Sequence, residues 1–196
     1  KKHPCFSHLS SDARSLLKTP RQQEIRTVVP GSYSHFGFSN FIKRILTFSK
    51  DNINCVKLAV HIDGLPLSKS SQQPFWPILG SVLPHGEVFI IGIYHGNEKP
   101  ADANDFLQDF VNEARDICTN GIDVNGRNIP CRIEALICDA PAIAFVLNVK
   151  GHTGYSSCTK CVTEGDYIGN RLCFPQLDAP LRSDSDFIQK LDDNYH

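Results

Sequence analysis

Residues 56–63 read VKLAVHID and are followed by Gly64. The alternation of apolar and polar side chains predicts a β-strand, and the Asp-Gly pair at its end is typical of a turn. Residues 75–83 predict a second strand, which Pro77 restricts to an edge or a bulge at that point. The unbroken apolar run of residues 88–94 predicts a third strand that is covered on both faces. Three successive strands with short connections indicate a meander.

A helix should follow the meander. Between Pro100 and Gly121 the apolar residues recur at helical spacing, and Asp102 and Asp105 place negative charge in the first turn. Gly121 is suited to ending this helix. The chain therefore changes from a period of two to a helical period after the third strand.

A fourth strand is predicted over residues 133–138 and ends at Asp139. Pro141 then lies in the first turn of a second helix, which should extend to about Val149. The order is strand, strand, strand, helix, strand, helix. This order predicts an α/β fold with a mixed sheet.

The first 50 residues differ from the rest in charge. They contain nine Lys/Arg and two Asp/Glu, a net charge of +7, whereas the remaining residues contain eleven and nineteen, a net charge of −8. Two helices are expected here, one capped by residues 10–12 and one over residues 38–46, with turn residues at 29–32 between them. A basic arm on an acidic body is common in proteins that bind nucleic acid, and an unevenly charged surface is the alternative. Lys43 and Arg44 are the candidate phosphate contacts.

Composition limits the class of protein. The 196 residues are 41% hydrophobic and 21% charged, which is typical of one globular domain with an added arm. No apolar run approaches the ~18 residues of a membrane span, and no signal peptide opens the chain. Neither a G-x-x-x-x-G-K-[ST] loop nor a G-x-S-x-G elbow occurs. Methionine is absent, so we expect the chain to be a piece of a longer protein.

Two acids lie at the ends of predicted strands. Asp63 ends the first strand and Asp139 ends the fourth, each immediately before a break in the pattern. Carboxylates that meet at one edge of a sheet can bind hard divalent cations, and a pair of such ions supports phosphoryl transfer. The alternative is that Asp63 begins a turn and Asp139 caps the following helix.

Only one close pair is found among the eight cysteines, Cys158 with Cys161, which favours a reduced, intracellular protein. Two thiolates at this spacing can bind one tetrahedral Zn²⁺ ion. His152, Cys173 and His196 are the candidate additional ligands, and we favour His196. A redox pair and a pair of buried thiols are the alternatives.

Five short segments follow one another in a specific order. They are HIDGLPL (61–67), FWPI (75–78), CDAPA (138–142), GHTG (151–154) and the pair of Cys158 and Cys161. Over roughly residues 56–182 this combination resembles transposase-derived proteins that are abundant in invertebrate genomes. Those proteins are distantly similar to CACTA-type (En/Spm) transposases.

The resemblance implies an RNase H-like fold with an acidic DDE/D triad. In such a core the first acid lies on the first strand and the second just after the fourth, the places of Asp63 and Asp139. They would bind Mg²⁺ or Mn²⁺ for phosphodiester cleavage and strand transfer. The third acid should lie on a helix after a zinc-binding insertion, and the chain stops before such a helix. We therefore expect the chain to be inactive alone.

The resemblance also divides the chain. Residues 1–54 would form the basic helical arm, residues 55–150 the first part of the core, and residues 151–196 the start of the insertion. Cys158 and Cys161 match the first half of its zinc site, with further ligands expected downstream.

The implied partner is DNA, the transposon ends, in a nuclear homo-oligomer without a membrane. His152 is left open between a zinc ligand, a DNA contact and a core residue. The alternative function is a domesticated or decayed remnant that acts as a zinc-containing module and binds nucleic acid or protein. The remaining alternative is an α/β domain whose two acids serve only as a turn residue and a cap.

Overall fold

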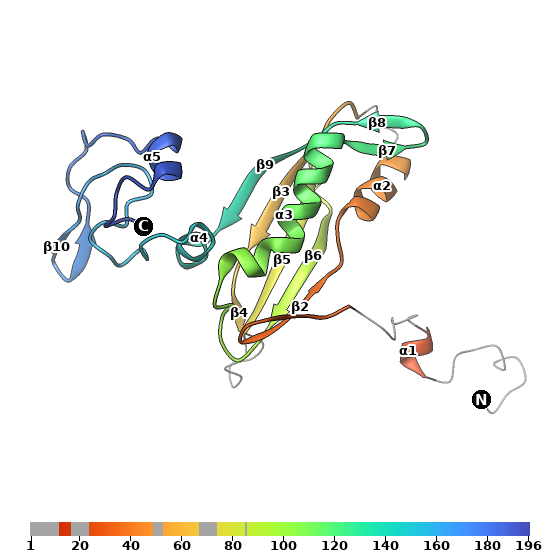
Figure 1. The fold of residues 1–196 in the computed structure, drawn as a ribbon, viewed down its shortest axis with the longest axis horizontal. Coiled ribbons are helices and arrows are strands. Elements are labelled where there is room, and N and C mark those ends of the chain that lie inside the picture. The colour runs from red at the N-terminus through yellow and green to blue at the C-terminus, as the bar shows by residue number, and fades with distance from the viewer. Residues whose placement is uncertain (1–11, 17–23, 49–52, 67–73, 85) are drawn as a thin grey trace, which may run out of the picture.

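The computed structural model describes residues 12–16, 24–48, 53–66, 74–84 and 86–196. Its main element is a mixed sheet in which three antiparallel strands form the predicted meander (Figure 1). These strands are β3 (Val56–Ile62), β5 (Pro74–Leu83) and β6 (Val88–His95). The short β4 (Leu65–Pro66) pairs with β5. The three predicted strands are thus confirmed, but β6 is not covered on both faces as expected, because Val88 and Ile90 are 61% and 47% exposed.

The fourth predicted strand is β9 (Cys131–Cys138), which begins two residues earlier than expected. It pairs with β3 in parallel and lies at the edge of the sheet, so the path of the sheet is β1-β2-β6-β5-β3-β9. The parallel pairing requires a crossover between β6 and β9, and α3 (Ala103–Asn120) supplies it. The predicted order of strands and helices is therefore confirmed for a mixed α/β protein.

The N-terminal part is not only helical, which corrects the prediction for this segment. The turn expected at residues 29–32 joins β1 (Arg26–Val28) to β2 (Gly31–His35) in an antiparallel hairpin. β2 also pairs with β6, so the hairpin extends the main sheet. Arg26 fastens this hairpin to α3 through ion pairs with Asp105 and Asp109.

Two helices of the N-terminal part match the predicted positions. α1 (Ala13–Leu16) begins after Asp12, whose carboxylate accepts a hydrogen bond from the Ser15 backbone at 2.9 Å. The remaining predicted capping residues, 10 and 11, lie outside the described residues. α2 (Ser39–Phe48) follows the hairpin and buries Ile42 against the sheet.

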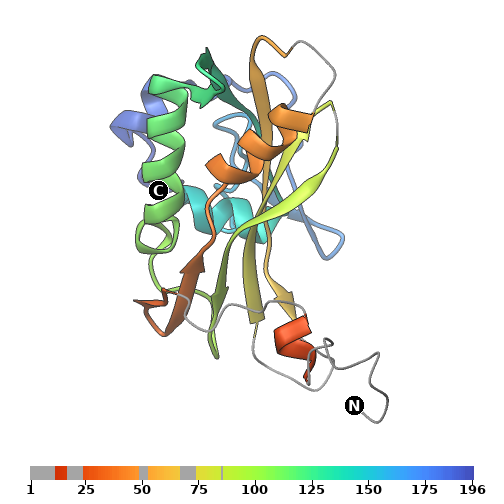
Figure 2. The ribbon, with the colours of Figure 1, turned by 90° about the vertical axis from the view of Figure 1, so that its right-hand side faces the viewer.

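Helices α2 and α3 cover the same face of the sheet, which Figure 1 shows from the front and Figure 2 from the side. Asp102, expected in the first turn of α3, is its N-cap, and the helix ends before Gly121, where φ is +73°. This left-handed conformation favours glycine, as the sequence predicted. Its apolar face buries Phe106, Phe110 and Ile117.

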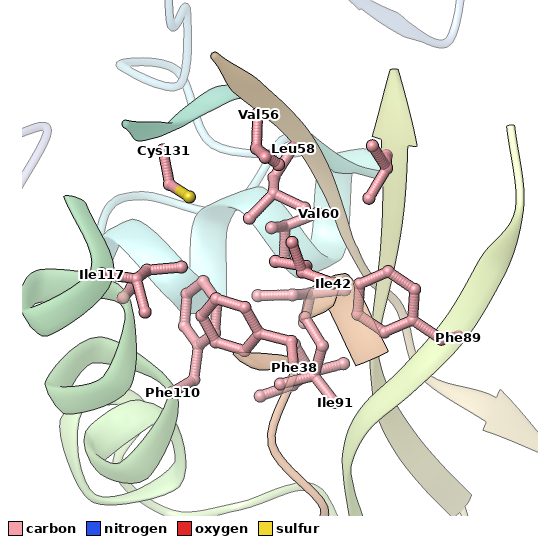
Figure 3. Packing of buried hydrophobic residues seen from close by; sticks show 14 of the residues in the cluster. Phe38, Ile42, Val56, Leu58, Val60, Phe89, Ile91, Phe110, Ile117 and Cys131 are labelled. Atoms are coloured by element: carbon pink, nitrogen blue, oxygen red, sulfur yellow. The ribbon is translucent and has the colours of Figure 1, made fainter. Parts of the chain in front are cut away.

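The core lies between these two helices and the sheet (Figure 3). Alternate residues of β3 point into it, so that Val56, Leu58, Val60 and Ile62 are almost fully buried while Lys57 and His61 face outward. The helix side of the core consists of side chains from both helices: Phe38, Ile42, Phe106, Phe110, Ala114 and Ile117. Burial of each Phe or Ile side chain in this set contributes about 1.5–3 kcal/mol.

The C-terminal third is built from short elements. After the hairpin of β7 (Ile122–Val124) and β8 (Arg127–Ile129), strand β9 leads into α4 (Ala140–Leu147). α4 is two residues shorter than predicted, because Asn148 adopts a left-handed conformation and caps the helix. A hairpin of β10 (Asp166–Ile168) and β11 (Arg171–Cys173) and the short α5 (Asp184–Gln189) complete the described residues. None of the helices described has the length and apolar composition to cross a membrane.

Candidate metal and nucleic-acid site

The register of β3 and β9 places Asp63 and Asp139 at corresponding positions. Ile62 pairs with Cys138 at the end of the two parallel strands. Asp63 directly follows Ile62, and Asp139 directly follows Cys138. Both carboxylates lie close to the Cys138 thiol. Burial of this thiol, together with the negative charges of Asp139 and Asp63, raises its pKa. The structure therefore brings the two predicted acids to one edge of the sheet.

Asp139 has a structural role as well. Its Oδ1 accepts a hydrogen bond from the Ala142 backbone at 2.7 Å, which makes it the N-cap of α4. The capping role considered for this residue is thus confirmed. The cap uses one carboxylate oxygen, and no described residue donates a hydrogen bond to the other. One oxygen of Asp139 remains for a cation while the other fixes the side chain.

The place of the Asp63 side chain is set by the backbone at the end of β3 and not by hydrogen bonds. It is half-buried, and within the described ranges no residue forms a hydrogen bond or ion pair with it. The following residue, Gly64, packs on the indole of Trp76, and an ideal Cβ at Gly64 would lie only 2.9 Å from that ring. Trp76 in turn meets Phe145 of α4 edge-on, with ring centroids 5.2 Å apart. The indole thereby joins the end of β3 to the helix that follows Asp139.

This packing explains why three of the quoted segments occur together. Residues 61–64 provide the first acid and its turn, residues 75–78 provide the indole, and residues 138–142 provide the second acid and the start of α4. A carboxylate pair without a cationic partner in the described part of the chain fits a hard divalent cation. Among the described residues no group of three or more His, Cys, Asp or Glu side chains is arranged to hold a metal ion.

The cysteine pair forms a second, separate feature. The Sγ atoms of Cys158 and Cys161 lie 3.4 Å apart. Burial opposes ionisation of the Cys158 thiol, but hydrogen bonds from the backbone N–H groups of Lys160 and Cys161 outweigh it and lower its pKa. Arg182 adds positive charge beside this thiol and donates a hydrogen bond from Nε to the Cys158 carbonyl at 2.9 Å. This is an environment suited to a thiolate.

The candidate additional zinc ligands do not gather around this pair. The His196 ring packs against the rings of Phe187 and Tyr195, with centroids 5.0 and 5.3 Å away. Cys173 lies on β11, and His152 is exposed in the loop after α4. The described ranges contain no cluster of three metal-binding side chains, so the two thiols fit half of a tetrahedral zinc site.

The predicted basic residues lie on α2, away from the acids. Lys43 and Arg44 are both exposed, and the Arg44 guanidinium lies 4.6 Å from the centroid of Phe41. Phe41 stacks on Phe89 at 4.1 Å. α2 packs beside the β7 hairpin, near the start of β3, whereas Asp63 follows the end of that strand (Figure 1). The structure does not bring these cations together with the two carboxylates.

One feature near the acids has no counterpart in the sequence pattern. A pocket of about 580 Å³ lies between the start of α3, helix α4 and the loop at residues 151–153. Lys99 lies at its edge, with Nζ 5.3 Å from the centroid of Phe145. Among the residues that line the pocket, only His152 is a candidate from the sequence. Lys99 is not, because no sequence pattern links it to α4, which begins 41 residues later.

No family model, no curated protein and no solved structure matches this chain. A functional assignment therefore rests on the arrangement of its residues.

Proposed function

We propose that this chain is the N-terminal and central part of a DDE-type DNA transposase with an RNase H-like core. One observation carries the proposal. Ile62 of β3 and Cys138 of β9 are the last paired residues of two adjacent parallel strands, and Asp63 and Asp139 follow them directly. The order of elements supports it, because an antiparallel meander followed by a crossover helix and a parallel fourth strand is the arrangement that such a core requires.

In this proposal the two carboxylates bind Mg²⁺ or Mn²⁺. Such ions stabilise the attacking and leaving oxygens of a phosphodiester during in-line displacement. One carboxylate oxygen of Asp139 would bind the ion, while the other accepts the hydrogen bond from Ala142 that caps α4. The contact of Gly64 with Trp76 positions Asp63. The third acid would come from a part of the protein beyond the described residues, so the chain by itself would bind metal weakly and cleave no DNA.

The cysteine pair supplies two of four ligands of a structural Zn²⁺ ion in this proposal. The short distance between the thiols and the lowered pKa of Cys158 support metal binding, since zinc binds thiolates. The remaining ligands would lie in the parent protein, because His196 packs against aromatic rings. DNA at the transposon ends is the proposed substrate, with a nuclear homo-oligomer as the active assembly.

Manganese binding tests the proposal directly. Mn²⁺ titration followed by electron paramagnetic resonance should show a site in the wild-type chain and a loss of affinity of about tenfold or more in Asp63→Asn and in Asp139→Asn, since even outer-shell partners of a metal are worth that much. Asp178→Asn removes an exposed carboxylate elsewhere and is the matched control. Unchanged Mn²⁺ affinity in both site variants would refute the proposal.

A second function is a remnant that retains the fold and the zinc ligands without cleaving DNA. The observation that favours it is the absence of a third acid beside Asp63 and Asp139 in the described residues. It predicts zinc binding that depends on Cys158 and Cys161 together with no Mn²⁺ site. The Mn²⁺ titration separates the two functions, and isothermal titration calorimetry with Zn²⁺ on the wild type and on Cys158→Ser tests the zinc binding that they share.

A further inference from the structure

The pocket beside α4 has walls of different chemical character. One wall is α4 itself, from Pro141 in its first turn to Asn148 at its C-cap. The opposite wall is the start of α3 with Lys99, and the loop that carries His152 completes the rim. A volume of about 580 Å³ is within the range of small-molecule sites and suits one nucleotide better than a peptide helix.

The groups that face this pocket suit a nucleotide. Phe145 presents an aromatic ring, and Lys99 holds its ammonium group 5.3 Å from the centre of that ring. Bases stack on aromatic side chains, and lysines neutralise phosphates, which makes this combination typical of contacts with single-stranded nucleic acid. His152 and Thr153 are exposed on the rim and add hydrogen-bonding groups.

Asp102 is the acidic residue that lines the pocket, and it repels a bound anion only weakly. Asp102 is the N-cap of α3, and its Oδ1 accepts hydrogen bonds from the backbone N–H groups of Asn104 at 2.6 Å and Asp105 at 3.4 Å. Its negative charge is therefore directed at the positive end of α3. Lys99 is the lysine on the pocket lining, and His152, Thr153, Asn104 and Asn148 supply its other polar groups.

The pocket lies close to Asp139 along the chain and is connected to the turn after Asp63 through Phe145 and Trp76. Pro141 lines it and is two residues from Asp139, and the eight residues of α4 extend about 12 Å along its wall. Phe145 also contacts Trp76, on which the turn after Asp63 packs. A strand with a phosphate at Asp139 would therefore have to follow α4 for only about 12 Å to cross the pocket.

We infer that this pocket binds one unpaired nucleotide of the DNA strand that flanks the scissile phosphate. Its base stacks on Phe145, and its phosphate contacts Lys99 and His152. The inference rests on the proposed function for the identity of the strand. The pocket itself is formed entirely by residues described here, so its binding is measurable on this chain without metal and without cleavage.

The test is fluorescence anisotropy with a fluorescein-labelled ten-nucleotide thymidine strand in EDTA, over a range of salt concentrations. Lys99→Gln should weaken binding and reduce the slope of log affinity against log salt by about 0.7, the value for one phosphate contact on a single strand. His152→Ala should also weaken binding. Lys57→Gln removes an exposed lysine at the start of β3, far from the pocket, and should bind as the wild type does.

Photochemical crosslinking locates the strand independently of these variants. A strand with 5-iodouracil in place of one thymine should crosslink to the peptides that contain Phe145 or His152. Wild-type affinity in both pocket variants, or crosslinks confined to α2, would overturn the inference. Because EDTA removes divalent ions, a failure of Asp63 and Asp139 to bind Mn²⁺ would leave this result intact, and the two failures are distinguishable.

Discussion

Gly64 lies against the indole of Trp76 so closely that a Cβ at this position would come within 2.9 Å of the ring. Trp76 is 8% exposed and is held on its other sides by Phe106 and Phe145, so it has little room to move. Gly64→Ala should therefore destabilise the protein by about 1–3 kcal/mol, the usual cost of overpacking a core. Urea unfolding followed by the fluorescence of this single tryptophan measures the effect.

Gly151→Ala is the matched control for that substitution. Nothing lies within 4 Å of a Cβ built at Gly151, and its φ is outside the left-handed region. Its stability should change by less than about 0.5 kcal/mol. Equal stability of the two variants would mean that Gly64 is not confined by the indole.

The sheet could be predicted from the sequence because its central strands encode their own burial. β3 alternates with a period of two, and an unbroken apolar run fills β6 up to its last residue, His95. The strand-end positions of Asp63 and Asp139 followed from that pattern. The hairpin of β1 and β2 could not be predicted, because strands of three and five residues with few apolar side chains carry too little periodicity.

The contacts between distant parts of the chain were also beyond prediction. Arg182 lies 24 residues after Cys158, and Lys99 precedes Phe145 by more than 40 residues, yet each pair is in contact. No local pattern specifies such pairs, since they depend on how the elements pack. The pocket beside α4 and the charge beside the cysteine pair therefore became visible only in the structure.

Glu113 of α3 should control stability in acid. Its carboxylate accepts hydrogen bonds from the Ser39 hydroxyl at 2.6 Å and the Ser39 backbone at 3.0 Å, and its Oε2 lies 2.9 Å from the His35 ring. Burial opposes ionisation, but these bonds outweigh it and lower the pKa to about 2. Because the folded-state pKa lies below the unfolded value, this contribution is complete above about pH 4.5 and is lost as the pH falls toward 2.

The expected size of this effect is about 2–3 kcal/mol at neutral pH. Glu113→Gln should remove the corresponding part of the slope of unfolding free energy between pH 4.5 and 2, as measured by urea titration at each pH. Glu134→Gln, which changes an exposed partner of Arg132 on β9, is the control and should keep the wild-type slope. An unchanged slope in Glu113→Gln would contradict this role.

Asp139 should affect stability through its cap, independently of metal. Asp139→Ala removes the acceptor for the Ala142 N–H and should cost ~1 kcal/mol, whereas Asp139→Asn retains a capping oxygen and should cost little. Asp63→Ala should change the stability by less than about 0.5 kcal/mol, because no described residue bonds to that carboxylate. Equal losses in the two alanine variants, measured by thermal unfolding in EDTA, would contradict the cap.

Cys158 should react with iodoacetamide before Cys131 does. Hydrogen bonds from Lys160 and Cys161 outweigh burial and lower the pKa of Cys158, whereas burial, followed by the nearby thiols, raises the pKa of Cys131 to about 11. The thiolate is the reactive form, so at pH 7.5 alkylation of Cys158 should be at least about tenfold faster, as read by peptide mass spectrometry. Added Zn²⁺ should protect Cys158 and leave Cys131 unaffected. Earlier alkylation of Cys131 would show that Cys158 carries no thiolate.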